Sequence, residues 1–297
     1  MVIVNYKAGR FANRLFHFSH FIVNSITHDY TLIYPYFDEY ATYFESTEKN
    51  IFPKGRITLN FFGNKLTRIA VSFSSKIIFK IFKTDKVLFF RRFYGYHQTR
   101  DAFFDLNEPA FIRQAKNALL IVEGWQYRDK KNFNEAHKNL LREIFTPKKI
   151  FLEKIKTNLW HYQKKDETIL IGVHIRRTDY KTFENGAWYF SDTLYAEKMQ
   201  AVKHIFETKN KKCTFYLCSD EPIVAQNFSD FEIIFDRQPD FISDLYTLAA
   251  CDYIFGPPST YSMWASFYGN VPLLKIFSSD EAIEIAKFGI VNPAIEP

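Results

Sequence analysis

Short apolar runs alternate with amphipathic stretches along the second half of the chain. The run Thr168–Ile175 is almost wholly apolar, which is typical of a strand buried on both faces of a sheet. Ser191 or Asp192 can cap a helix whose apolar stripe comprises Leu194, Met199, Val202 and Phe206. Further strands are expected at 214–218, 233–235, 253–255 and 271–276, and helices at 222–227, 243–250 and 261–268. This alternation predicts βαβ units and a parallel sheet.

The first half is less regular but indicates a second α/β domain. Strands are expected at 2–4, 31–34 and 119–122, with a helix over 11–26. A helix-like stretch ends around 146–149, which places the domain boundary there. We therefore expect domains at 1–148 and 149–297. The uncharged segment 253–274 approaches the length of a membrane span, but its Gly and Pro residues favour strands and turns instead.

Composition narrows the class of protein. The 297 residues are 47% hydrophobic and 24% charged, which excludes wholesale disorder. A net charge of +6 suits an anionic ligand and is too small to imply nucleic-acid binding. Cys213, Cys218 and Cys251 show no metal-binding or redox spacing, so we expect reduced thiols in a cytoplasmic protein without a secretory signal.

Positive charge is concentrated between residues 54 and 92, where ten Lys and Arg residues face a single acid, Asp85. Apolar residues at helical spacing run through 66–83 and predict a basic amphipathic helix. Such a helix can lie on the inner face of an anionic membrane as a peripheral contact. The alternative, which we favour, packs its apolar face on the domain and leaves its lysines in water.

Polar residues collect where the strands of the second half end. The sets are His174, Arg176, Arg177 and Asp179; Ser219 and Asp220; Asp236; and the loop 256–260. Carboxyl ends of parallel strands share one edge of a sheet, where ligands bind in open α/β folds. Paired guanidinium groups and a loop that feeds a helix N-terminus suit a pyrophosphate, and this arrangement needs no metal. The chain has no P-loop motif and no G-x-G-x-x-G after its first strand, which disfavours ATPases and dinucleotide oxidoreductases.

Several segments resemble one enzyme family. The stretch 172–180 (GVHIRRTDY) resembles the H-x-R-R-x-D signature of α1,2- and α1,6-fucosyltransferases and their protein O-fucosylating relatives. Segments 9–16, 216–221 and 259–265 resemble the other motifs of that family, and 124–127 resembles a segment of its bacterial α1,2 members. The matches occur in family order over nearly the whole chain.

This resemblance implies a GT-B architecture of two facing Rossmann-like domains with parallel sheets. It implies metal-independent, inverting transfer of L-fucose from GDP-fucose to a glycan hydroxyl, with an α1,2 linkage to an oligosaccharide or glycolipid. By position, Arg176 would grip the β-phosphate, His174 would lie beside the diphosphate and sugar, and Asn13 would reach the reacting sugar or acceptor. The remaining donor contacts would come from Arg177, Ser219, Asp220, Ser259, Thr260, Tyr261, Gly9 and Arg10, with Asp220 or a neighbour facing the guanine.

Plainer interpretations accompany these assignments. His174 can be a core histidine, Asp179 can merely orient an arginine, and Asp220, Ser259 and Thr260 can be helix caps. Departures from the family pattern at Ala12, at Arg14 and at 256–258 (GPP) affect the acceptor side and hence the linkage. Other linkages, a protein acceptor, another GDP-sugar or a non-catalytic nucleotide-sugar-binding module are the alternative functions.

Overall fold

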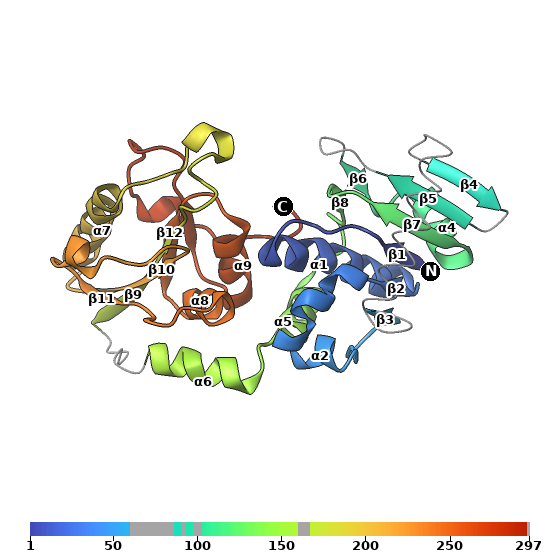
Figure 1. Ribbon diagram of the computed structural model, residues 1–297, viewed down its shortest axis with the longest axis horizontal. Helices are drawn as coiled ribbons and strands as arrows, with labels where there is room; N and C mark the ends of the chain where they lie inside the picture. The colour runs from blue at the N-terminus through green and yellow to red at the C-terminus, as the bar shows by residue number, and fades with distance from the viewer. Residues whose placement is uncertain (60–85, 91–92, 98–102, 160–166, 296–297) are drawn as a thin grey trace. The chain divides into compact units, whose positions relative to one another are not determined.

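The computed structural model describes residues 1–59, 86–90, 93–97, 103–159 and 167–295 (Figure 1). The chain divides into two compact units, one formed by Met1–Lys148 with Pro293–Pro297 and the other by Lys149–Asn292. The division falls after Lys148, while the last residues group with the first unit rather than with the second domain expected from the sequence.

The first unit is built on a largely parallel sheet. Its described strands run in the order β3-β2-β1-β7-β5-β4, and only β4 is antiparallel to its neighbour. The expected strands and the long helix are present, together with five described strands, β3, β4, β5, β6 and β8, that the sequence pattern did not predict. The elements are β1 (Val2–Val4), α1 (Phe11–His28), β2 (Leu32–Ile33), η1 (Pro35–Tyr43), α2 (Glu45–Glu48), β3 (Ile57–Thr58), β4 (Lys86–Phe90), β5 (Phe93–His97), β6 (Phe104–Asp105), α4 (Pro109–Asn117), β7 (Leu119–Glu123), β8 (Tyr127–Arg128) and α5 (Glu135–Ile144).

The amphipathic helix expected over 66–83 lies outside the described residues. No helix among those that are described is long and apolar enough to cross a bilayer. The three cysteines are buried free thiols.

The second unit is a parallel sheet in the order β11-β10-β9-β12-β13, with β9 at its centre. Its strands and α helices follow the predicted alternation closely. The segment 222–227 differs, because only a 3₁₀ turn at 225–228 forms there, after Pro222. The elements are α6 (Lys149–Asn158), β9 (Thr168–Ile175), η2 (Phe183–Gly186), α7 (Asp192–Glu207), β10 (Lys212–Ser219), η3 (Ala225–Phe228), β11 (Glu232–Ile234), α8 (Phe241–Leu248), β12 (Tyr253–Gly256), α9 (Thr260–Gly269), β13 (Leu273–Lys275) and η4 (Ile285–Lys287).

The central strand β9 is apolar on both faces because helices cover both faces. Val173 belongs to a buried cluster with Met199 and Val202 of α7. Gly172 points to the opposite face, where an added Cβ would lie 2.7 Å from Leu248 of α8. This alternation is the reason that Thr168–Ile175 reads as a continuous apolar run.

Candidate functional site

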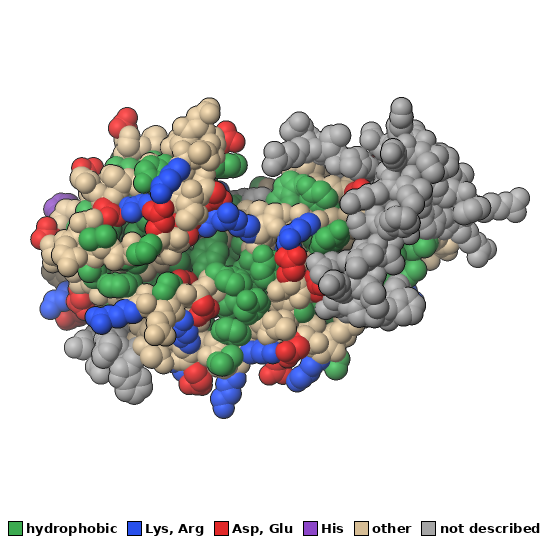
Figure 2. Space-filling view, in the orientation of Figure 1, with side chains coloured by type: hydrophobic (Ala, Val, Ile, Leu, Met, Phe, Trp, Pro, Cys, Tyr) green, Lys and Arg blue, Asp and Glu red, His purple; other side chains and the backbone are tan. Residues whose placement is uncertain are grey.

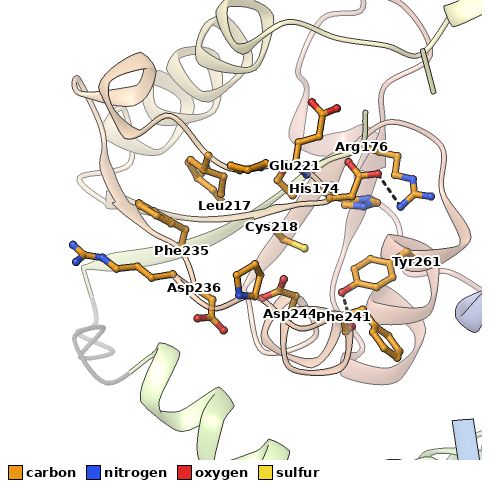
Figure 3. A pocket seen from close by; sticks show the side chains of 16 residues that line it. His174, Arg176, Leu217, Cys218, Glu221, Phe235, Asp236, Phe241, Asp244 and Tyr261 are labelled. Carbon is orange, nitrogen blue, oxygen red and sulfur yellow. Dashed lines mark hydrogen bonds and ion pairs between the residues drawn. The ribbon is translucent and has the colours of Figure 1, made fainter. Parts of the chain in front are cut away.

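A cavity of about 680 Å³ lies at the carboxyl edge of the second unit's sheet. Figure 3 shows Arg176 and His174 at one end, Phe235 and Asp236 at the other, and Cys218 between them. The lining residues come from the carboxyl ends of β9 and β10, from the segments that follow β9, β10 and β11, and from the starts of α8 and α9. They are His174, Arg176, Leu217, Cys218, Ser219, Asp220, Glu221, Pro222, Ile223, Phe235, Asp236, Arg237, Pro239, Phe241, Asp244 and Tyr261. Both the volume and the mixed lining suit a nucleotide-sized ligand.

The Arg176 guanidinium is held between two carboxylates. Its Nη2 lies 2.8 Å from Asp179 Oδ1, and its Nη1 lies 3.0 Å from Asp220 Oδ2. The side chain is 17% exposed, so it is preorganised at the mouth of the cavity without being sealed from it. Guanidinium donors beyond those two pairs remain able to meet an incoming anion. Asp179 therefore holds the Arg176 side chain at this position.

Asp220 organises the loop that follows β9. Its carboxylate accepts hydrogen bonds from Arg177 N at 2.8 Å and from the Thr178 hydroxyl at 2.6 Å. It does not cap a following helix, because the chain turns at Pro222 and the neighbouring Ser219 hydroxyl accepts from Glu221 N instead. Asp220 thus lines the cavity and also fixes the backbone that carries Arg176.

His174 is a neutral ring at the cavity wall. It is 3% exposed, and burial, reinforced by the nearby Arg176, lowers its pKa to about 3. Its Nδ1 atom is buried, and no group in the described part of the chain forms a hydrogen bond with it. A neutral imidazole at this place can donate or accept one hydrogen bond to a ligand but carries no charge to it. Its plain core interpretation is incomplete, because the ring also lines the cavity.

Gly256 is required by the close approach of β12 to β9. A Cβ at this position would clash with the His174 carbonyl oxygen and lie 3.0 Å from His174 Cβ. The absence of a side chain at Gly256 therefore fixes the position of the strand end that carries His174.

The second arginine of the pair turns away from the cavity. Arg177 forms an ion pair with Asp192, the first residue of α7, and its Nε donates to Phe190 O at 3.3 Å. Its guanidinium also lies 5.9 Å from the Tyr195 ring centre. The structure thus brings Arg176 to the cavity and assigns Arg177 to anchoring the strand end on α7.

The loop 256–260 is positioned beside the site rather than in its wall. Ser259 is the N-cap of α9, and its hydroxyl accepts from Tyr261 N at 3.3 Å. Neither Ser259 nor Thr260 is among the described residues that line the cavity. Tyr261 does line it, and its hydroxyl donates to Phe241 O at 2.7 Å. The Tyr180 hydroxyl donates to Pro258 O and joins this loop to the segment after β9.

Several cavity residues were not among the site residues expected from the sequence, including Phe235, Arg237, Phe241 and Asp244. Asp244, in the first turn of α8, accepts a hydrogen bond from the Tyr216 hydroxyl at 2.7 Å. Burial raises its pKa to about 7. The only available signal was an acidic residue on the apolar face of an amphipathic helix. Acidic residues are also favoured in the first turn of any helix. That signal therefore could not identify a cavity residue unless the face of the helix that packs on the sheet was known.

The N-terminal candidates belong to the first unit. Gly9 has a left-handed φ of +50°, and a Cβ there would lie 3.1 Å from Asn13 Cγ. Arg10 is the N-cap residue of α1, and Asn13 lies in its first turn. Arg14, one of the departures from the family pattern, is 1% exposed. Its guanidinium donates to Tyr36 O at 2.7 Å and Gly9 O at 3.3 Å, so it fastens the loop to η1.

Trp125, in the segment 124–127 of the family resemblance, also has a defined place in this unit. His17 stacks on its ring at 5.6 Å, and the Arg128 guanidinium lies 5.2 Å from it. The segment is thereby tied to α1. Among the described residues, no group of three or more His, Cys, Asp or Glu side chains could hold a metal ion.

No family model and no curated protein sequence matches the chain. Solved structures do match it. A mutant of FUT1 from Arabidopsis thaliana in complex with GDP has a TM-score of 0.62 at 12% identity, over 97% of this chain and 73% of that one. POFUT1 in complex with GDP-fucose gives 0.53 at 12% identity, over 93% and 96% of the two chains. The fucosyltransferase NodZ from Bradyrhizobium gives 0.52 at 14% identity, over 97% and 96%.

At such low identity, these likenesses concern the fold. The protein has a GT-B fold, α/β in class, with two Rossmann-like units built on largely parallel sheets. This confirms the fold class predicted from the sequence.

Proposed function

We propose that the protein is a GDP-fucose-dependent fucosyltransferase that moves L-fucose to a hydroxyl of a glycan acceptor. The finer parts of this proposal are an α1,2 linkage, inversion at the anomeric carbon, no metal requirement and a cytoplasmic location. The observation that carries it is the cavity at the carboxyl edge of the second sheet, because the guanidinium of Arg176, held by two carboxylates, stands at one end of a largely apolar and acidic pocket whose lining also includes Arg237. The fold shared with proteins solved with GDP-fucose or GDP supports the choice of donor.

The cavity suggests how the donor would lie. Arg176 would neutralise the diphosphate at one end, with His174 donating a neutral hydrogen bond beside it. The nucleobase of the donor would enter the part of the cavity lined by Phe235 and Phe241. There the Asp244 carboxylate can accept hydrogen bonds from N–H groups. Guanine carries two adjacent N–H donor groups on one edge. A carboxylate therefore binds guanine better than a nucleobase whose corresponding edge carries hydrogen-bond acceptors.

The chemical step follows from this placement. The acceptor oxygen bonds to the anomeric carbon, and the bond from that carbon to the β-phosphate oxygen breaks with its electron pair leaving on GDP. The acceptor hydroxyl proton goes to solvent or to a neighbouring base. Because negative charge grows on the leaving diphosphate, Arg176 stabilises the transition state more than the ground state.

The test measures GDP binding by calorimetry and GDP release from GDP-fucose in the presence of a glycan panel. We expect Arg176→Ala to remain folded and to lose about 10²–10³-fold in rate. Arg113→Ala, an exposed arginine on α4, is the matched control and should retain wild-type rates. GDP binding without release under any acceptor condition would instead indicate a nucleotide-sugar-binding module. Linkage analysis of the product would decide between α1,2 and other linkages, and between glycan and protein acceptors.

A further inference from the structure

An exposed aromatic patch lies on the second unit and has no part in the donor site described above. The patch consists of Phe183, Trp188, Tyr189 and Phe277. Phe183 is 47% exposed, Tyr189 42% and Phe277 52%. Single exposed rings need no explanation, but a group of adjacent ones indicates a binding surface.

Phe183 and Phe277 are joined through Trp188, which precedes Tyr189 in the chain. Its ring centre lies 5.7 Å from that of Phe183 and 6.3 Å from that of Phe277. Phe183 in turn stacks on Tyr180, with ring centres 5.5 Å apart and an interplanar angle of 21°. Two segments that are distant in sequence, the loop around η2 and the stretch after β13, therefore contribute to one surface.

The loop that carries three of the four rings has a defined backbone. Glu184, Asn185 and Gly186 have consecutive left-handed φ values of 48°, 56° and 78°. Hydrogen bonds from Ala187 N to Glu184 O at 3.1 Å and from Tyr189 N to Gly186 O at 3.0 Å close the turn. Such backbone costs conformational energy and is typical of binding sites that are preorganised.

The patch is continuous with the proposed donor site. Tyr180, on which Phe183 stacks, lies 5.7 Å from the Arg176 guanidinium, measured to the ring centre. Lys181 Nζ also forms an ion pair at 2.6 Å with Glu221, which lines the cavity. A molecule resting on the patch is therefore beside the phosphate end of the cavity, where the fucosyl group would be transferred.

We propose that this patch binds a pyranose ring of the acceptor glycan by stacking, an inference that rests on the proposed function. A pyranose offers an apolar C–H face to aromatic rings and a rim of hydroxyl groups to polar neighbours. Exposed Lys181, Glu184 and Asn185 on the same loop provide that polar rim. A lipid surface would instead favour an uninterrupted apolar face, and charges of both signs are interspersed with hydrophobic side chains over the visible face of this unit (Figure 2).

The test separates acceptor binding from donor chemistry. The probe is an array of immobilised neutral oligosaccharides, read with fluorescently labelled protein in the presence of GDP. A double variant, Phe183→Ala with Trp188→Ala, and a single variant, Phe277→Ser, are compared with Ile290→Ala. Ile290 is 48% exposed in the same unit and lies outside the patch. GDP affinity by calorimetry and acceptor-free GDP release from GDP-fucose are measured on all proteins.

We expect the wild-type protein and Ile290→Ala to bind the same glycans. The patch variants should bind these glycans at least about tenfold more weakly. GDP affinity and acceptor-free GDP release should be unchanged. If the patch variants bind glycans as well as the wild-type protein does, or if the wild-type protein binds no glycan, the patch does not bind the acceptor. Failure of the wild-type protein to bind GDP would overturn the proposed function instead, so the two failures are distinguishable.

Discussion

Arg176 and Asp220 are linked twice, once through their side chains at 3.0 Å and once through the backbone, because the same carboxylate accepts from the residue after Arg176. The arginine is therefore held in position by contacts within the protein itself. Placing a charged donor before the ligand arrives lowers the reorganisation cost of binding.

Loss of the Asp220 carboxylate should affect both stability and binding. Asp220→Ala leaves Arg177 N and the Thr178 hydroxyl without their acceptor, so we expect a loss of about 2 kcal/mol in the free energy of unfolding and weaker GDP binding. Denaturant unfolding and calorimetry measure these effects. Asp230→Ala, at an exposed position in the same unit, should change neither, and a wild-type Kd for GDP in Asp220→Ala would remove Asp220 as a positioning residue.

The two carboxylates after the arginine pair should matter less than the arginine. Asp179 is held in an ion pair with Arg176, and Glu184 is exposed. We expect Asp179→Asn and Glu184→Gln each to reduce kcat less than Arg176→Ala does. Turnover at saturating GDP-fucose compares the three. A carboxylate variant less active than the arginine variant, with GDP affinity intact, would establish a dedicated base and contradict this order.

GDP affinity should rise with pH around neutrality. Burial raises the pKa of the Asp244 carboxyl to about 7. The N–H donors of a bound nucleobase would favour the ionised form of this carboxyl. The ligand then binds the deprotonated protein better, so affinity should increase by up to about tenfold between pH 6 and pH 8. Calorimetry across this range measures it, and Asp244→Asn should flatten the profile. An unchanged slope in that variant would exclude Asp244 from the base pocket.

The same group should act on stability in the opposite direction. An acid with a raised pKa in the folded state stabilises the protein below its unfolded value of about 3.8, and this contribution is lost as the pH rises through about 7. In the absence of ligand, the Asp244 contribution to the free energy of unfolding should therefore fall between pH 4 and pH 7. The difference between wild-type and Asp244→Asn unfolding curves isolates that contribution, and a difference that does not vary with pH would contradict it.

Two glycines provide a matched pair for testing strand packing. Gly256→Ala places a Cβ against the His174 backbone and should cost about 1–3 kcal/mol in the free energy of unfolding. Gly289→Ala meets no atom within 4 Å and should leave the Tm nearly unchanged. Thermal unfolding of both variants is the measurement. Equal Tm values would show that β12 can move away from β9.

Transfer should survive chelation, because the proposal assigns charge neutralisation at the diphosphate to Arg176. GDP release is measured with and without EDTA, and then with Mg²⁺ or Mn²⁺ restored. Activity that disappears with EDTA and returns with either metal would contradict this assignment.

The periodic parts of the fold could be predicted from the sequence, and the choice between neighbours in the site could not. Thr168–Ile175 is a strand covered on both faces, so most of its residues are apolar and the run is recognisable as a buried strand. Arg176 and Arg177 are chemically identical in sequence, yet one lines the cavity and the other pairs with Asp192. That difference depends on partners supplied by distant segments.

Asp244 and the loop 256–260 show the same limit. The pKa of Asp244 is raised by burial, and its carboxylate accepts a hydrogen bond from Tyr216, a contact between a helix and a strand that no local pattern encodes. Ser259 has the residue type of a phosphate ligand and of an N-cap, and the structure uses it as the cap. Sequence located the edge of the sheet where the site lies, while packing decides which side chains enter the cavity.

The central position of β9 has a consequence for how the protein is made. Ile171 pairs with Phe215 on one side and with Tyr253 on the other, so the strand that carries His174 and Arg176 stays incomplete until most of the second unit has been synthesised. Parallel pairings between distant segments form late and slowly, and they leave apolar edges open to other chains meanwhile. Ribosome-bound intermediates that end before residue 253 should therefore be prone to aggregation and unable to retain nucleotide, and nucleotide retention would report completion of the fold.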